Sequence, residues 1–237
     1  MSSDQTFFKV NDNYVLEPCN IKEIIDDSNK EELEKRLKKE YLTDFRMEFY
    51  KSTSTKNLKL EDDYMEFITA KCIGGSWVGE GHCPIDITKN DKGIDVLCVC
   101  LNGNRTNEKS IMQNFTNCGN KLDTLFEACE YQEALSLYTK QYHKKLLEAK
   151  ETNKIEKLYY LAFISTSVNV YMSVFKINLD SILKIKYDSI TEKKKSIRFK
   201  GFIDDKLGFT TLFKSKKRLE IRLYKEILNS VNTIKLI

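Results

Sequence analysis

The chain has 237 residues, of which 41% are hydrophobic, and its formal net charge is +4. This length can bury one substantial core, and no apolar run approaches the length of a membrane span. The first residues, MSSDQTFFKV, lack the basic start and apolar stretch of a secretory signal, and the seven cysteines are an odd number scattered along the chain. We therefore expect a cytoplasmic protein with reduced, buried thiols, and not a secreted disulfide scaffold or a membrane protein.

The charge is distributed unevenly. Residues 1–138 carry 17 Lys and Arg against 25 Asp and Glu, a net of −8, whereas residues 139–237 carry 22 against 10, a net of +12. Such a basic half would attract a phosphate backbone if its cations share a face; otherwise they are solvated edges and loops. The cations expected to contact nucleic acid are Lys194, Arg198, Lys216, Lys217 and Arg218.

The N-terminal part is expected to be mainly helical. Residues 1–19 show no periodicity and are interpreted as an irregular arm. From residue 21 to about residue 50, apolar residues recur at helical spacing, with a break and a new N-cap predicted at residues 26–28. A second helix is predicted from Leu60 to about Ile73, ending at two glycines, and it carries Glu66.

The stretch that follows, residues 74–101, predicts a β-hairpin with one acidic residue in each strand. PIDI and GIDVLCVCL are rich in Ile, Val, Leu and Cys, and the segment TKNDKG between them is polar and turn-prone. Asp86 and Asp95 would then lie on adjacent strands. Because a carboxylate is costly to bury in an apolar strand without a compensating partner, two of them side by side suggest a divalent metal.

The rest of the chain predicts helices followed by strands. Residues 102–115 form a turn-rich loop in which Ser110 could cap the next helix, and helices are expected to run to about Lys150. Residues 157–179 are nearly continuous in apolar residues, as in central strands covered on both faces. Three amphipathic segments, SIRFKGFI, GFTTLFKS and RLEIRLYKEI, predict strands with a cationic face. The expected fold class is α/β or α+β, a mixed sheet flanked by helices.

Other chemistries fit less well. Ser76 follows two glycines but lacks the spacing of a nucleophile elbow, and no phosphate-binding G-x-x-x-x-G-K-[ST] loop occurs. A zinc site from Cys72, His82, Cys83 and Cys98 would lack any C-x-x-C pair. His82 could serve as a base or ligand beside the acidic strand, although a hydrogen-bonded structural histidine is the plainer interpretation.

The remaining arrangement is a helix with Glu66, a glycine turn, a strand with Asp86, a strand with Asp95, a further helix and strands, and a basic half. It resembles the PD-(D/E)xK nuclease superfamily, in particular type II restriction endonuclease-like domains. The match is closest from Glu61 to Phe115: Pro84-Ile85-Asp86 stands at the PD position, and Asp95 stands at the second acid. The resemblance implies a restriction-endonuclease-like fold over residues 1–237, with residues 1–58 a helical arm and 155–237 a basic, β-rich half.

One residue departs from the family pattern. The position two after Asp95 is Leu97, where the family has a lysine that helps to activate water. A displaced lysine must therefore be found, and Lys109 is the first candidate and Lys92 the second. An alternative interpretation takes Asp95 as the first acid and Glu108-Lys109 as a contracted second motif. Glu80 and Glu66 are candidates for an additional ligand.

The resemblance implies a Mg²⁺-dependent endonuclease that hydrolyses double-stranded DNA, belongs to a restriction system and acts as a homodimer. Asp86 and Asp95 would hold the metal, and Lys109 would act on the attacking water. Two alternatives stay open. Asp86 and Asp95 could be structural in a non-catalytic nucleic-acid-binding or interaction module, or the domain could be an RNA-cleaving toxin nuclease.

Overall fold

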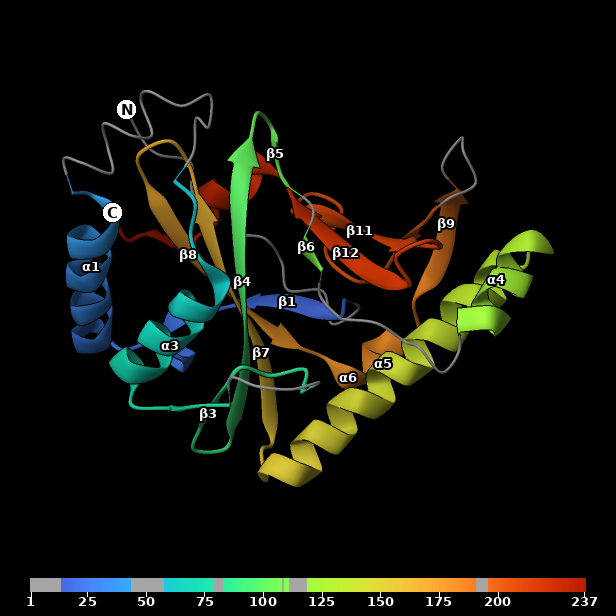
Figure 1. Cartoon of the computed structure of the whole chain (residues 1–237), viewed down its shortest axis with the longest axis horizontal. Coiled ribbons are helices and arrows are strands. Elements are labelled where there is room, and N and C mark those ends of the chain that lie inside the picture. Colours follow the sequence, from blue (N-terminus) through green and yellow to red (C-terminus); the bar gives the residue numbers. More distant parts are fainter. Residues whose placement is uncertain (1–13, 44–57, 79–82, 108, 111–118, 191–195) are drawn as a thin grey trace.

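The structure is a computed structural model that describes residues 14–43, 58–78, 83–107, 109–110, 119–190 and 196–237. It is a mixed α+β structure with two sheets and several helices (Figure 1). The long helix α5 (Tyr131–Asn153) packs against both sheets. The shorter helices α1 (Asp27–Tyr41) and α3 (Asp62–Ile73) cover the opposite face of the first sheet. The predicted fold class is therefore confirmed at the level of a mixed α/β architecture.

The first sheet is organised around a long central strand, β4 (Lys92–Asn102). In the order β1-β8-β7-β4-β3-β2, all neighbours are antiparallel except β4 and β7, which run parallel over nine residue pairs from Lys92 and Lys157 to Cys100 and Ser165. The other strands are β1 (Leu16–Cys19), β2 (Ser76–Trp77), β3 (Ile87–Lys89), β5 (Arg105–Thr106), β7 (Lys157–Ser165), β8 (Val170–Ile177) and β13 (Thr233–Lys235).

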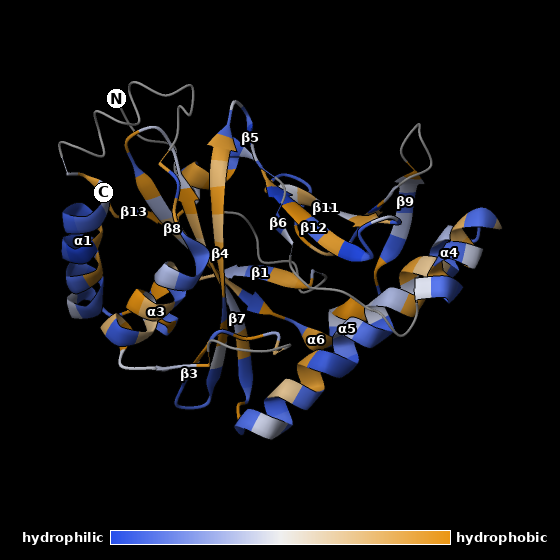
Figure 2. Ribbon diagram, viewed as in Figure 1, coloured by the Kyte–Doolittle hydropathy of each residue, from blue (hydrophilic) through white to orange (hydrophobic). Residues whose placement is uncertain are grey.

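Both faces of this sheet are buried, as the apolar runs predict. One face carries Ile94, Val96 and Cys98 against α1 and α3, while the other carries Leu97 and Val99 against α5 and the second sheet. Figure 2 shows the matching pattern, with apolar colour along β4 and on the inner side of the helices. Parallel strands need a crossover connection, and α4 (Gly119–Glu127) together with α5 supplies it between β4 and β7.

The second sheet is built mainly from the basic C-terminal part. Its order is β6-β12-β11-β10-β9, and all of its pairs are antiparallel. The strands are β6 (Lys109–Ser110), β9 (Lys186–Ile190), β10 (Ser196–Lys200), β11 (Gly208–Phe213) and β12 (Arg218–Leu223). The three amphipathic segments are strands as predicted, but they form a separate sheet. The expectation of one mixed sheet was wrong, because their apolar faces pack on α5 from another side.

Several local predictions are confirmed. The helix break lies where the acidic pair predicts it: the short 3₁₀ helix η1 (Ile21–Glu23) precedes α1, and the Asp26 carboxylate accepts the Asn29 N–H at 2.8 Å as an N-cap. Helix α3 ends at Gly74, whose φ of 68° is the left-handed conformation that glycine adopts without strain. The hairpin turn falls between β3 and β4, and Asn90 adopts a positive φ there.

Other local predictions were wrong. Residues 16–19 form strand β1 and are not part of an irregular arm, because their backbone pairs with β8. The interval after β4 contains β5 and β6, so Ser110 is a strand residue and does not cap a helix.

The remaining short helices are α6 (Leu179–Ile182) and η3 (Lys225–Asn229). No described helix is long and apolar enough to cross a membrane.

Candidate active site

The site begins at the edge of β4 where its pairing with β3 stops. Asp86 immediately precedes β3, and its backbone N–H donates to the Ile94 carbonyl at 2.9 Å. Its carboxylate then accepts the next edge donor, the N–H of Val96, at 2.7 Å. The Asp86 side chain thus continues the ladder in place of a backbone carbonyl. This fixes the carboxylate at the open edge of the central strand.

Asp95 lies beside it on β4 and is hydrogen-bonded to Asp86. Burial raises the pKa of Asp95 well above its ordinary value, and the neighbouring Asp86 charge raises it further. The pKa of Asp86 is also raised by burial, although the Val96 N–H, Asp95 and the Lys109 charge oppose that shift. The sequence prediction that these two acids meet is therefore confirmed. The prediction that Asp86 lies inside a strand was wrong by one residue, since β3 begins at Ile87.

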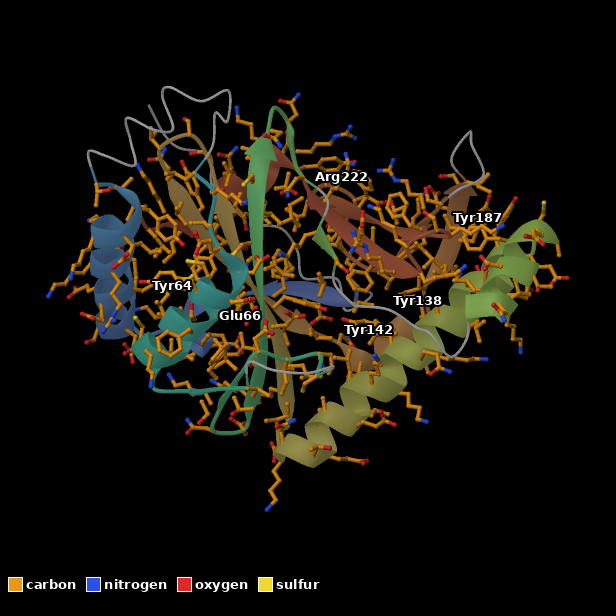
Figure 3. All side chains as sticks on the ribbon, viewed as in Figure 1. Tyr64, Glu66, Tyr138, Tyr142, Tyr187 and Arg222 are labelled. Carbon is orange, nitrogen blue, oxygen red and sulfur yellow. The ribbon has the colours of Figure 1, made fainter. Side chains whose placement is uncertain are left out.

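Two buried tyrosines support Asp95 from the core. Tyr160 stands opposite Asp95 in the parallel β4–β7 ladder and is hydrogen-bonded to its carboxylate. The hydroxyl groups of Tyr160 and Tyr142 are 2.7 Å apart, and neither side chain is exposed. Tyr142 reaches upward from α5 toward the sheet (Figure 3). A continuous hydrogen-bonded path therefore leads from α5 through both tyrosines to Asp95 and Asp86.

Glu66 joins the cluster from α3. It lies on the side of that helix facing β4 (Figure 3), and its Oε2 accepts the indole N–H of Trp77 at 3.3 Å. Burial and the Asp86 charge raise the pKa of Glu66 to about 7, although the Trp77 hydrogen bond opposes the shift. Glu66 therefore titrates near neutral pH, as candidate acid–base groups in functional sites often do.

Lys109 supplies the positive charge at this site. From β6 at the edge of the second sheet, its ammonium forms an ion pair with Asp62, and it lies close enough to Asp86 to lower that residue's pKa. Lys92, the other candidate, donates instead to the backbone carbonyl of Glu23, on η1. Of the two displaced lysines considered, the structure brings Lys109 to the acids.

Asp62 is the site residue that the sequence reasoning missed. It lies one helical turn before Glu66, so the two share a face of α3. One of its carboxylate oxygens pairs with Lys109, whereas Oδ1 is buried without a hydrogen-bond partner among the described residues. The i, i+4 spacing of two acids at the start of that helix was the available signal.

The remaining predicted residues contribute differently. Leu97 shares the Asp95 side of β4, but it is 3% exposed and packs in the core against α5. Cys98 points to the opposite face, where burial raises its pKa well above the ordinary value, and the described side chains form no zinc site around it. Glu80, His82 and Glu108 lie outside the described residues.

The predicted nucleic-acid contacts lie on the second sheet and its β11–β12 turn. Lys216 and Arg218 both pair with Glu220, at 2.8 and 2.7 Å, and Lys217 pairs with Asp123 on α4. The Arg198 guanidinium lies 4.1 Å from the ring centre of Phe209. Lys194 falls outside the described residues. Much of this positive charge is thus paired with carboxylates, and the charge count of the sequence does not show these ion pairs.

The acids suit a hard divalent cation such as Mg²⁺, which is commonly bound through one or two carboxylates with water and phosphate oxygens completing its shell. Within the described part of the chain, no three His, Cys, Asp or Glu side chains form a self-sufficient metal group. Asp86 and Asp95, which are adjacent and have raised pKa values, are the carboxylates through which a cation would be held. A cation would relieve the repulsion among these acids.

Comparison with known proteins found no match among protein-family models, curated proteins or solved structures. The function of the chain is therefore inferred from the chemistry of the site itself.

We predict that Glu66 makes stability fall as the pH rises from about 4.5 to about 7. In this window folded Glu66, with a pKa of about 7, retains a proton that the unfolded chain, with a pKa near 4.5, has released. Urea unfolding across this range should show the decline, and Glu66→Gln should reduce it. Since Trp77 is the chain's single tryptophan and donates to Glu66, its fluorescence should titrate near pH 7 in the wild type only. An unchanged pH titration of Trp77 in Glu66→Gln would contradict this assignment.

Tyr160→Phe should lower the free energy of unfolding by about 1–3 kcal/mol, the usual cost of leaving a buried polar group unsatisfied. The change removes a donor from Asp95 and leaves the buried Tyr142 hydroxyl without this partner. Tyr142→Phe should cost less, because Tyr160 still reaches Asp95. Urea unfolding measures both. The carboxyl NMR titration of Asp95 should shift in Tyr160→Phe. It should stay unchanged in the matched control Tyr159→Phe, whose side chain lies on the other face of β7.

Proposed function

We propose that the protein is a Mg²⁺-dependent endonuclease with a restriction-endonuclease-like fold. The observation that carries this proposal is the convergence of Asp86, Asp95 and Glu66 with one lysine, Lys109, at the open edge of β4. Three carboxylates with raised pKa values beside a cation are suited to binding a metal and activating water.

The order of elements supports the same proposal. An acidic helix, α3, precedes β2, β3 and β4, and a helical crossover then leads to β7 beside β4. In this proposal Glu66, Asp86 and Asp95 correspond to the helix and hairpin acids that the family resemblance implies. The site lies where α3, the hairpin and strand β6 of the second sheet meet.

The residues have distinct roles in the proposed reaction. Asp86 and Asp95 would hold Mg²⁺, which when bound polarises a phosphate and lowers the pKa of an attacking water. Lys109 would orient that water and stabilise the charge that develops on the phosphate. Glu66, with a pKa near neutrality, can accept a proton at physiological pH. Tyr160 and Tyr142 keep the Asp95 carboxylate in place from behind.

Double-stranded DNA is the proposed substrate, with the basic second sheet contributing phosphate contacts. Sequence-specific cleavage within a restriction system, and a homodimer matching a palindromic site, follow from the resemblance. Arg198 and Lys217 are the cations on which we place these contacts, because Lys217 pairs with Asp123, whose side chain is 38% exposed, whereas Lys216 and Arg218 are engaged by Glu220, whose side chain is 2% exposed.

Asp86→Asn and Asp95→Asn should each reduce Mg²⁺-dependent cleavage of plasmid DNA by several orders of magnitude and leave DNA binding intact or tighter, because each loses a negative charge near phosphate. Lys109→Ala should also lose most cleavage. Lys92→Ala is the matched control, since Lys92 is turned away toward Glu23. Cleavage should be assayed on plasmid and total RNA, with Mg²⁺ and with EDTA. Wild-type rates in Asp86→Asn would overturn the site.

Replacing Arg198 and Lys217 together by Gln should weaken DNA binding and flatten its salt dependence. The log–log slope should decrease by about 0.9 for each phosphate that the variant no longer neutralises. This pair leaves the Glu220 ion pairs intact, so the fold keeps its buried carboxylate compensated. The control is Lys22→Gln with Arg36→Gln, two cations near and on α1 at the far side of the first sheet. Equal slopes in both double variants would show that the second sheet does not bind phosphate.

A non-catalytic nucleic-acid-binding module is the second candidate. The observation that favours it is Leu97, which fills the position of the family lysine with a buried apolar side chain. The cleavage assay separates the two functions: nucleic-acid binding without any Mg²⁺-dependent cleavage would support the module, and smeared RNA with intact DNA would indicate the toxin-like nuclease.

A further inference from the structure

The turn between β11 and β12 is held against α4 by two ion pairs. Lys214 Nζ lies 3.3 Å from Glu127 Oε1, and the Lys217 ammonium pairs with Asp123. Asp123 and Glu127 are four residues apart in the helix, so their side chains share one face of α4. One face of this helix therefore neutralises two cations of a single turn.

Both ion pairs are accessible to solvent. The Glu127 side chain is 72% exposed and that of Asp123 is 38% exposed. Exposed ion pairs contribute little to the free energy of folding, because water and salt screen them. Glu220, which pairs with Lys216 and Arg218, is by contrast 2% exposed. The turn therefore carries two cations that can exchange partners beside two that a buried carboxylate retains.

Lys217 is held in a position that costs free energy. Its φ is 49°, a left-handed conformation that residues with a side chain rarely adopt. Its Cε lies 3.7 Å from the place that a Cβ on Gly119 would take, so the side chain lies against the first residue of α4. The N-terminus of a helix disfavours a nearby cation. Asp123 offsets this cost, and a phosphate that draws Lys217 away from α4 would relieve it.

Strand β12 connects this turn to the candidate active site. Arg218 is its first residue, and Ile221, three residues later, pairs with Lys109 of β6. Three residues of strand span about 10 Å, which is the rise of about three nucleotides along one strand of a DNA duplex. A duplex whose reacting phosphate lies near Lys109 would therefore have other phosphates of the same strand within reach of the turn.

We propose that Lys214 and Lys217 form a binding surface for the DNA backbone that the free protein covers with the carboxylates of Asp123 and Glu127. Binding exchanges these carboxylates for phosphates, so α4 lowers the affinity of the protein for DNA. This inference rests on the DNA substrate of the proposed function, and it adds Lys214 and an internal competitor on α4.

The test removes the acids and leaves the lysines. The probe is a fluorescently labelled DNA duplex, titrated into the intact protein with Ca²⁺ in place of Mg²⁺, since Ca²⁺ takes the same oxygen ligands. Asp123→Asn with Glu127→Gln should tighten binding by roughly 2- to 30-fold, the combined contribution of two exposed ion pairs, measured by fluorescence anisotropy. Glu130→Gln with Glu133→Gln is the matched control, because it removes the same charge from exposed residues that follow α4. The control should tighten binding less.

A second background separates exchange of partners from a general effect of charge. In Lys214→Gln with Lys217→Gln, the substitutions at Asp123 and Glu127 should change the affinity no more than the control pair does. Equal tightening in both backgrounds would mean that the acids act only as general negative charge, and the inference would be overturned. Circular dichroism should show that all variants keep the wild-type fold.

The ion pairs themselves can be tested without DNA. Acetylation of Lys214 and Lys217, followed by mass spectrometry, should be faster when Asp123 and Glu127 are replaced, because a paired ammonium is less accessible to the reagent. Equal rates in the wild type and in this variant would show that α4 does not cover the lysines, and would overturn the inference.

The outcomes distinguish this inference from the proposed function. Tighter binding in the Asp123→Asn, Glu127→Gln variant, without cleavage of any nucleic acid, would support the exchange and overturn the nuclease. Mg²⁺-dependent cleavage with wild-type affinity in that variant would support the nuclease and overturn the exchange. Failure of the wild type and of every variant to bind DNA would overturn both.

Discussion

The parallel pairing of β4 with β7 is the constraint on which the rest of the structure depends. It spans nine residue pairs and places Asp95 directly beside Tyr160. Because parallel neighbours cannot be joined by a tight turn, the intervening chain must cross one face of the sheet, and α5 does so. The same crossover brings Tyr142 under Tyr160, so the support of the candidate site is a consequence of the topology.

The candidate site also depends on where the pairing of β4 ends on its other side. Strand β3 is only three residues long, so the β4 edge beyond Ile94 must find other partners. The Asp86 carboxylate takes one of these positions and the side chain of Asn107 takes another, accepting the Cys100 N–H at 2.8 Å. A carboxylate that completes a ladder is positioned more rigidly than one on a loop. Rigid positioning of acids is what a metal site requires.

Electrostatics and packing conflict at this edge. Burial raises the pKa of Asp86, Asp95 and Glu66, so the apolar surroundings that hold these side chains also disfavour their charged forms. Lys109 compensates part of this cost from the second sheet, through Asp62 and Asp86. The two sheets therefore do more than share a core: the second contributes a cation, Lys109, to the acids of the first. Such a local cost is expected where function and stability compete.

The sequence by itself determined the helices and strands that depend on patterns of neighbouring residues. Alternation and apolar runs predicted β4, β7, β8 and the amphipathic strands, and the Asp26 cap and the glycine after α3 marked helix boundaries. It also determined that Asp86 and Asp95 meet, because a hairpin turn fixes its own register.

Only the tertiary structure decided what depends on distant segments. It placed Lys109 and not Lys92 at the acids, added Asp62, and divided the strands into two sheets. It also paired Lys216 and Arg218 with Glu220, and Lys217 with Asp123. These contacts join residues far apart in the chain, and no local pattern records which of several charged side chains will be neighbours after folding.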